Sequence, residues 1–430
     1  MRNIHPKNRS RVRCLSGALL LGAVVTVSSA AEFTGVGFLS GVSQSITFAV
    51  SGDGNVAVGE SIGPRGMEAF RWTKIDGLTG LGFLVPSFTE SQAFGVNADG
   101  SVIVGAAGHP DAHLEEGAPF RWTQATGMVL IPNLGGSDAG GIAEGTTPDG
   151  SLVVGWCASP TIYQPFSWSA TSGTQGLGLL PDERLGRGLA VSADGSFIVG
   201  NVSLGSTSFP RAFRWTADAG VVVLPSLNPG AISSANAVTP DGSVIVGLSG
   251  GRAAMWTGDT VVSLGVFPDG DPAATYTAKA ITADGSVVVG LGNFNAGQGE
   301  GEAFIWDTTH GIRRLRDVLV ADFGLDLTGW GLFEANGISA DGSVIVGDGF
   351  DPQGFQEGWV ARLRFPLPGD MNCDGTVNFA DINPFVLALS GQAAYQAQFP
   401  NCRWLNADCN GDGTVSFADI NPFVALLSGG

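Results

Sequence analysis

The sequence has few charged residues, few basic residues and no long apolar run in its main body. Asp, Glu, Lys and Arg make up 14% of the 430 residues, against 44% hydrophobic residues. This excludes an intrinsically disordered chain, which needs low hydrophobicity and a high charge density. Ala, Glu, Lys and Leu do not dominate at a helical period, which excludes a long coiled coil. The net charge of −18 opposes binding to nucleic acid and suits divalent cations.

The first 31 residues have the three-part pattern of a secretory signal peptide. Five basic residues precede an apolar run from Leu15 to Val27, and small residues around Ala30 follow. No later apolar run reaches the roughly 18 residues of a membrane-spanning helix. We therefore expect residues 1–31 to be removed on export. The mature protein would be extracellular or at the cell surface, without a membrane span.

Export leaves four cysteines, which are Cys157, Cys373, Cys402 and Cys409. An oxidising compartment permits disulfides, and at most one can form among the last three. The sequence does not choose the pairing. We expect Cys157, which is far from the others, to be a buried free thiol.

What the sequence has in excess is glycine, 66 of 430 residues, and much of it belongs to a repeated unit. Segments such as TPDGSVIVG from Thr239 and SADGSVIVG from Ser339 occur seven times. The glycine of each Asp-Gly pair falls at 54, 100, 150, 195, 242, 285 and 342, which gives a mean spacing of 48 residues. A fixed period of this length indicates a repeat architecture.

Each unit has the same order of short apolar segments. An apolar stretch precedes Asp-Gly, and a β-branched run ended by a glycine follows, which predicts a hairpin with a tight turn at positive φ. A Phe-x-Trp segment such as Phe213–Trp215 comes next, and strand alternation puts both rings on one face. A further strand completes the unit, as at 177–180 or 221–224. Residues 36–39 are its expected counterpart before the first unit.

These units predict an all-β fold. Four short strands, repeated seven times, are typical of a β-propeller or a β-solenoid, and solenoid coils are usually shorter than this. We expect a seven-bladed β-propeller over residues 34–365, with the Trp of each unit wedged between neighbouring blades. The longest spacing, before Gly342, carries Val318, Leu319 and Phe323, for which we expect one short helix against the last blade.

The DGSVIVG and AFRW segments resemble the extracellular repeat family called HAF, found in secreted bacterial proteins. The resemblance covers about three quarters of the chain. It implies a propeller and export, and it implies nothing about a ligand.

Residues 366–430 contain two copies of a twelve-residue acidic loop. Oxygen-bearing side chains at positions 1, 3, 5, 9 and 12, with Gly375 or Gly413 at position 6, are the pattern of an EF-hand calcium loop. The expected ligands are Asp370, Asn372, Asp374, Thr376, Asn378 and Asp381 in the first loop, and Asp408, Asn410, Asp412, Thr414, Ser416 and Asp419 in the second. Position 12 is Asp, a shorter arm than the usual Glu. We expect two Ca²⁺ sites, on which this small domain depends for its folding.

Both loops continue as Ile-Asn-Pro-Phe-Val, which predicts a short helix with Pro384 or Pro422 in its first turn. The two loop-helix units resemble a type I dockerin over 366–430, which implies a cohesin-like or other extracellular scaffold partner. The resemblance places partner contacts at loop positions 10 and 11, where many dockerins have Ser-Thr. The residues there are Phe379, Ala380, Phe417 and Ala418. The near-identical halves predict docking in either orientation. Phe385 and Phe423 are either core residues or partner contacts.

No catalytic set stands out. His109, Asp111, His113, Glu115 and Glu116 form the one metal-like cluster outside the tail, and a solvated loop explains them better. Loop acids such as Asp269, Asp271, Glu300 and Glu302 could pair for glycoside hydrolysis. We expect a secreted, non-enzymatic binding or surface-architecture protein, whose propeller binds proteins or glycans and whose tail docks in a calcium-dependent way. The alternative is a polysaccharide-active enzyme, a glycoside hydrolase or lyase, delivered by the same tail.

Overall fold

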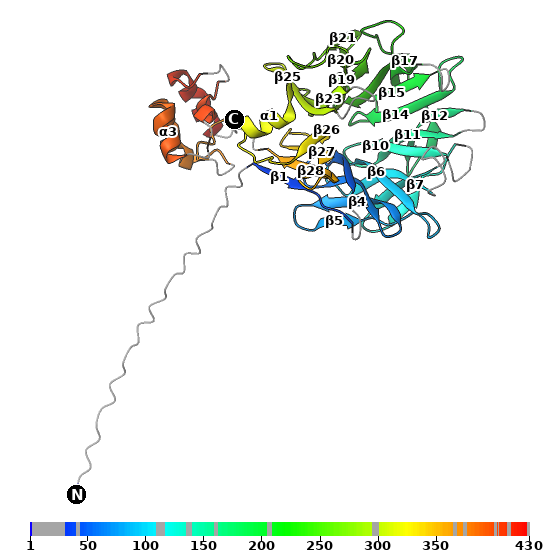
Figure 1. Ribbon diagram of the computed structural model, residues 1–430, viewed down its shortest axis with the longest axis horizontal. Coiled ribbons are helices and arrows are strands. Elements are labelled where there is room, and N and C mark those ends of the chain that lie inside the picture. Colours follow the sequence, from blue (N-terminus) through cyan, green and yellow to red (C-terminus); the bar gives the residue numbers. More distant parts are fainter. Residues whose placement is uncertain are drawn as a thin grey trace. The chain divides into compact units, whose positions relative to one another are not determined.

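A computed structural model describes Met1 and residues 31–39, 44–108, 117–134, 140–158, 162–203, 209–294, 301–363, 368–372, 376–399, 402, 404–410 and 414–427. The chain divides into two compact units after Phe365. The first is a β-propeller, and the second, the tail, consists of short helices (Figure 1). The predicted signal peptide, residues 1–31, lies outside the described residues except for Met1 and Ala31. No helix among the described residues has the length and apolarity that crossing a membrane requires.

Four sheets of the propeller are antiparallel meanders of four consecutive strands. They are β2 (Ser45–Val50), β3 (Ala57–Gly63), β4 (Gly66–Thr73) and β5 (Gly77–Gly80); β6 (Glu90–Val96), β7 (Val102–Gly108), β8 (Ala118–Thr123) and β9 (Gly127–Leu130); β18 (Ser233–Val238), β19 (Val244–Ser249), β20 (Arg252–Thr257) and β21 (Thr260–Ser263); and β22 (Thr275–Ile281), β23 (Val287–Phe294), β24 (Glu302–Asp307) and β25 (Gly311–Arg314).

A larger, eight-stranded sheet contains two such meanders. They are β10 (Gly141–Thr146), β11 (Leu152–Ala158), β12 (Tyr163–Ser169) and β13 (Gly173–Gly176), then β14 (Leu185–Val191), β15 (Ile198–Ser203), β16 (Arg211–Thr216) and β17 (Gly220–Val223). A single parallel pairing of Tyr163 with Leu185 joins them.

The last sheet of the described propeller takes its strands from both ends of the unit. It contains β26 (Gly331–Ile338), β27 (Val344–Phe350), β28 (Gln356–Arg362) and, from the start of the propeller, β1 (Glu32–Gly35). β1 pairs antiparallel with β28 (Figure 1). The first strands of the meanders contact one another in chain order, and β26 contacts β2, so they form a closed ring around an axis.

Two predicted outer strands are displaced from their expected positions. The strand expected at 36–39 lies at Glu32–Gly35, because Gly37 has φ +79° and turns the chain away. The strand expected at 177–180 ends before it, at Gly176. In both places the hydrophobic segment packs as a coil after the strand.

Aromatic side chains pack each meander against the one before it, as the repeat predicts. Trp72 of the first meander packs with Val344 and Val346 of the last, and Trp359 of the last packs with Val289 of the meander before it. Trp122, Trp168, Trp215, Trp256 and Trp306 make the equivalent contacts. Phe70, Phe120, Phe166, Phe213 and Phe304, two residues before a Trp, are fully buried. The Trp residues are therefore packing residues.

The Asp-Gly turns differ from the predicted tight hairpin. In the loop from Ser192 to Phe197, the Ser192 hydroxyl donates to Asp194 Oδ1 (2.8 Å), which also accepts from the Ser196 backbone N–H (2.9 Å). Gly195 has φ +74°, but Asp194 does not have positive φ, as a type I′ turn requires. The Asp therefore supplies hydrogen bonds that a six-residue loop cannot make from backbone alone.

These hydrogen bonds also hold the Asp residues in their ionised form. The Ser196 hydroxyl and backbone lower the pKa of Asp194 to about 2, and the Thr239 hydroxyl does most to lower that of Asp241 to about 2. A carboxylate with a lowered folded-state pKa contributes stability above its unfolded pKa and loses it as pH falls through the folded value. The stability that these two carboxylates contribute should therefore be lost progressively between about pH 4 and about pH 2.

The sequence indicated that the glycine after each β-branched run ends the strand. In the structure this glycine lies within the strand. Gly200 is in β15, opposite a bulge between Gly188 and Ala190 of β14. A Cβ on Gly200 would lie under 3.0 Å from the Arg187 carbonyl oxygen. The other six glycines, 59, 105, 155, 247, 290 and 347, face a first-strand carbonyl in the same way. A bulge commonly needs such a close backbone approach.

We predict that Gly200→Ala destabilises the propeller by roughly 2–3 kcal/mol, since the methyl group must displace a strand carbonyl. Chemical denaturation measures this. Gly331→Ala is the matched control, because its Cβ would have its nearest neighbour at 4.0 Å. Equal denaturation midpoints for the two variants would contradict a close contact between Gly200 and the Arg187 carbonyl.

The short helix predicted in the longest repeat is present as α1 (Leu315–Ala321). Leu315, Val318 and Leu319 are buried with Ile305 of β24 and Trp359 of β28. The helix thus packs at the junction of the last two sheets.

The described tail contains the two predicted helices, α2 (Ile382–Leu389) and α4 (Ile420–Leu427), and a third, α3 (Gln392–Gln398). Three short 3₁₀ helices accompany them: η2 (Phe379–Asp381), η3 (Trp404–Ala407) and η4 (Phe417–Asp419). Phe385 of α2 stacks on Phe423 of α4, with ring centroids 4.0 Å apart and planes within 5°. Each ring is 3% exposed, so both are core residues. The two halves of the tail therefore share one core.

The cysteines fall into two groups. Cys157 is a buried free thiol, as predicted, and Cys409 is also free. Cys402 is disulfide-bonded, and its partner lies outside the described residues.

Candidate functional site: the tail loops and the propeller axis

The last residue of each tail loop ties the loop together. Asp381 is fully buried, and its Oδ1 accepts hydrogen bonds from the backbone N–H groups of Met371 (2.7 Å) and Asn372 (3.0 Å). Its Oδ2 accepts from Asn378 N–H (2.9 Å). In the second loop, the same oxygens of Asp419 accept from Cys409 (2.9 Å), Asn410 (3.1 Å) and Ser416 (2.8 Å). The shorter Asp thus reaches the start of its loop.

The residue at position 9 begins the helical part of each unit. Asn378 Oδ1 accepts from the Ala380 backbone N–H (2.8 Å), and Ser416 Oγ accepts from Ala418 N–H (3.1 Å). Both form a capping box with the Asp three residues later. Positions 9 and 12 therefore fix the loop-helix junction identically in both halves.

The donor set of the tail fits a hard cation. Its described residues include four Asp and no Lys, Arg or His. Burial, followed by the charges of Asp419 and Asp408, raises the pKa of the Cys409 thiol to about 12. Carboxylate, amide and hydroxyl oxygens in this pattern suit Ca²⁺ rather than a transition metal. Positions 4–6 of both loops, with Asp374, Asp412 and the two glycines, lie outside the described residues. Among the residues described, no three His, Cys, Asp or Glu side chains are grouped to hold a metal.

We predict that chelation unfolds the tail, because Ca²⁺ would offset the charge that its loop carboxylates concentrate. Circular dichroism at 222 nm with and without excess EGTA should show a loss of helix in EGTA that CaCl₂ restores. Asp381→Asn with Asp419→Asn should lose the same signal. A melt unchanged by EGTA would contradict calcium-dependent folding.

The predicted partner contacts lie on the surface of the tail. Phe379 is 79% exposed and Phe417 is 77% exposed. Ala380 and Ala418, and the helix residues Ile382, Val386, Ile420 and Val424, are exposed next to them in sequence. Each half thus presents the same apolar surface, a Phe followed by a helix edge.

The propeller brings together a second group of residues, along its axis. The residue at the bulge opposite the second-strand glycine varies in type from one first strand to the next. The seven residues are Phe48, Phe94, Glu144, Leu189, Asn236, Lys279 and Asn336. Several reach the neighbouring first strand. Lys279 Nζ lies 3.0 Å from Glu334 Oε2, and Asn236 donates to the Ala278 carbonyl (2.8 Å). Because the first strands surround the axis, these side chains line it.

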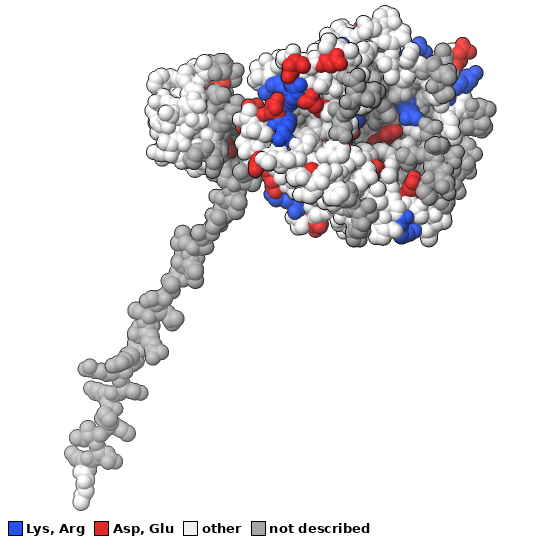
Figure 2. Space-filling model, in the orientation of Figure 1, with Lys and Arg blue, Asp and Glu red and all other residues white. Residues whose placement is uncertain are grey.

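Two acids lie beside this lining, on second strands. Glu60 and Asp348 follow the bulge-facing glycine in the first and the last meander, and they are 6% and 2% exposed. Asp348 accepts hydrogen bonds from Asn336 (3.1 Å) and Gln356 (3.0 Å). Figure 2 shows acidic side chains in a hollow toward the middle of the face that it draws.

Burial dominates the titration of both acids. Burial, opposed by a hydrogen bond from Gln92 and aided by the charges of Glu90 and Asp348, raises the pKa of Glu60 to about 7. It also raises the pKa of Asp348 to about 7, with Glu334 adding and Lys279 opposing. Sequence reasoning missed these acids. The one signal in the sequence was variation at the position after the bulge-facing glycine, where the neighbouring positions repeat. The residues there are Glu60, Ala106, Trp156, Asn201, Leu248, Leu291 and Asp348.

We predict that Glu60→Gln stabilises the protein by about 1–3 kcal/mol at pH 8 and has little effect at pH 4. A carboxyl with a raised folded-state pKa contributes stability below its unfolded pKa and loses it as pH rises through about 7. Denaturation at the two pH values measures the difference. Asp259→Asn, at an exposed turn, is the control. The same effect at both pH values would contradict a buried, proton-binding Glu60.

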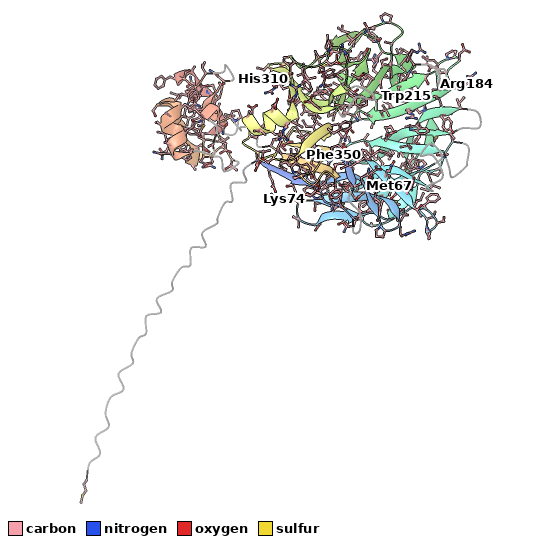
Figure 3. The ribbon with its side chains drawn as sticks, viewed as in Figure 1. Met67, Lys74, Arg184, Trp215, His310 and Phe350 are labelled. Atoms are coloured by element: carbon pink, nitrogen blue, oxygen red, sulfur yellow. The ribbon has the colours of Figure 1, made fainter. Side chains whose placement is uncertain are left out.

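The loop acids that could have served hydrolysis have structural partners. Asp269 Oδ1 lies 2.6 Å from Arg314 Nη1, and Glu302 Oε2 lies 2.5 Å from Arg314 Nε. Asp271 accepts from the Ala273 backbone N–H (2.7 Å). A cleft of about 390 Å³ near α1 is bordered by Asp269 and by His310, which lies at the edge of the ring (Figure 3). Glu300 and the 109–116 cluster lie outside the described residues.

Comparisons with known proteins concern the fold alone. No family model and no curated protein matches the chain. The Swd1 β-propeller domain of Myceliophteria thermophila matches at 12% identity, over 77% of this chain and 100% of that one, with a TM-score of 0.49. The β-propeller domain of the trilobed protease of Pyrococcus furiosus matches at 13%, over 75% and 94%, with a TM-score of 0.45. TolB of Acinetobacter baumannii matches at 13%, over 61% and 60%, with a TM-score of 0.36. This chain thus spans about three fifths of that TolB.

Proposed function

We propose that this is a secreted, non-enzymatic binding or surface-architecture protein, whose β-propeller is attached to an extracellular scaffold through a calcium-dependent, dockerin-like tail. The observation that carries the proposal is the pair of matched apolar surfaces at Phe379 and Phe417. Two exposed phenylalanines on a domain this small carry a solvation penalty that a partner would remove. Phe385 and Phe423 in the core show that the tail can bury such rings where its own stability needs them.

The propeller part of the proposal is a ring of seven blades of the HAF type. Its support is that seven first strands contact one another in sequence and that the eight-stranded sheet divides into two meanders. The turns add a second line of support. Ala340 of the last turn donates to Gly52 of the first (3.0 Å), as Ala193 donates to Pro240 in the next turn along the chain (2.8 Å). Seven loops at one face suit the presentation of a protein or glycan ligand.

The tail part of the proposal is two Ca²⁺ sites and a cohesin-like or other scaffold partner. In each half the loop aspartate and the cap residue hold the exposed Phe at the start of the helix. Calcium would fix this geometry, because the loop precedes the contact residues directly. Since the two halves are near-identical, either could meet the partner.

The enzymatic alternative has one observation in its favour, the two axial acids. Acids with a raised pKa are typical general acids. However, Glu60 and Asp348 are 6% and 2% exposed, and a polysaccharide chain needs both carboxyls within reach of one glycosidic bond. We therefore favour binding over hydrolysis.

We predict that the full-length protein retains a secreted or envelope partner in CaCl₂ and releases it in EGTA. Phe379→Ala with Phe417→Ala should abolish retention, and either substitution alone should leave it largely intact. Phe209→Ala is the control, because Phe209 is a 70% exposed ring on the propeller. Retention that survives the double substitution would exclude these surfaces as the docking site.

A further inference from the structure

The axis is where the repeats differ most. The residues that pack the meanders together, the Asp-Gly turns, the bulge-facing glycines and the Phe-x-Trp segments, are nearly the same in every unit. The bulge residues beside them include two Phe, one Leu, one Glu, one Lys and two Asn. Packing alone would favour one residue type at equivalent places. The variety indicates that the axis has a role of its own, separate from the scaffold.

Negative charge dominates one side of this axis. The charges of Glu90 on β6 and Asp348 on β27 act on Glu60 of β3, and those of Glu334 on β26 and Lys279 on β22 act on Asp348. Four carboxyl groups and one ammonium group therefore influence one another where the last, first and second meanders join. Buried charge of one sign is costly unless a proton or a cation offsets it.

Two buried oxygen atoms beside these acids have no hydrogen-bond donor among the described residues. They are Glu60 Oε2 and Gln92 Oε1, each on a side chain that is 6% exposed. Gln92 Oε1 is an acceptor only, and Glu60 Oε2 is one once the carboxyl is ionised; the Gln92 amide nitrogen donates to Met67 Sδ (3.0 Å). Above about pH 7, where Glu60 has lost its proton, an incoming group must therefore donate hydrogen bonds.

Two aromatic rings belong to the same two meanders as Glu60 and Gln92. Phe48 and Phe94 are the bulge residues of the first two meanders, and their ring centroids are 5.2 Å apart. Both are half-buried. Aromatic faces attract cations, and they attract organic cations through contact as well.

We propose that the axis is a binding site for a ligand that carries a protonated amine. The ammonium group donates to Glu60 Oε2 and Gln92 Oε1, Asp348 and Glu334 contribute charge, and Phe48 and Phe94 contact the carbon next to the nitrogen. A neutral polyol would leave the charge unbalanced. A bare metal ion finds no group of three acid, His or Cys ligands among the described residues. The site does not depend on the tail, and it goes beyond the docking function proposed above.

Proton linkage gives this site a pH dependence. Below about pH 7 the cluster holds protons on Glu60 and Asp348, and a bound ammonium group must displace them. Affinity for an amine should therefore rise between pH 5.5 and pH 8. A simple alkylamine remains protonated over this range.

The test is the unfolding midpoint of the full-length protein with n-butylammonium, in constant CaCl₂. At pH 8 and a concentration several times the dissociation constant, we expect a rise of about 1–3 °C. The rise should be smaller at pH 5.5 and absent with n-butanol, which has the same chain without the charge. Glu60→Gln should abolish it and Asp348→Asn should weaken it, each compared with its own midpoint without ligand. Asp259→Asn should retain it.

Three results would overturn the proposal. Equal shifts in the wild type and Glu60→Gln would place the amine elsewhere. Equal shifts with n-butanol would show an apolar effect. A shift that depends on Glu60 and appears on raising CaCl₂ but not with the amine would make the axis a metal site. The wild type and Glu60→Gln have the same tail, so the effect of CaCl₂ on the tail is the same in both. A difference between their responses to CaCl₂ therefore comes from the axis.

Discussion

The packing of each meander's Phe and Trp against the β-branched strand of the meander before it is the interaction on which the rest of the propeller depends. A single four-stranded sheet of this size has two apolar faces and cannot bury either alone. Val344 and Val346, for example, are covered by Trp72 from the far end of the propeller sequence. The ring therefore has to close, and β1 closes it by pairing with β28. This explains why unit after unit keeps the same rings.

The same constraint leaves the axis free to vary. Each first strand has a bulge at the same place in the repeat, and this bulge brings a carbonyl onto a glycine of the second strand. That contact fixes the backbone, so the bulge side chain itself is not needed for packing. Glu144 illustrates the result, because it accepts a hydrogen bond from Trp156 Nε1 (3.2 Å) and is influenced by the charge of Arg187, whereas at the same two positions of the last meander Asn336 donates to Asp348 (3.1 Å). Repetition builds the frame, and the positions it does not constrain can carry specificity.

Much of this could be read from the sequence, since the repeat signals are local. The hairpins, the Phe-x-Trp strands, the wedged Trp side chains, α1 and the helices after each tail loop follow from short patterns. Four features did not. The Asp of Asp-Gly acts through side-chain hydrogen bonds, which propensity for a tight turn does not reveal. The glycine after the β-branched run is required because a carbonyl oxygen of the neighbouring strand lies where a Cβ atom would be. Glu60 and Asp348 lie 288 residues apart in sequence and meet only because the ring closes. The hydrogen bonds of Asp381 to its own loop could not be predicted either, because a calcium-ligand pattern does not show which backbone N–H groups also donate to the carboxylate.

The two units divide the chemistry in our account: the tail takes the metal and the partner, and the axis takes an organic cation. A calorimetric titration of metal-free full-length protein with CaCl₂ tests this division most directly. It predicts two bound calcium ions, both lost in the Asp381→Asn, Asp419→Asn double variant and neither affected by Glu60→Gln. No binding at all, or a calcium ion that persists in the double variant and disappears with Glu60→Gln, would contradict it.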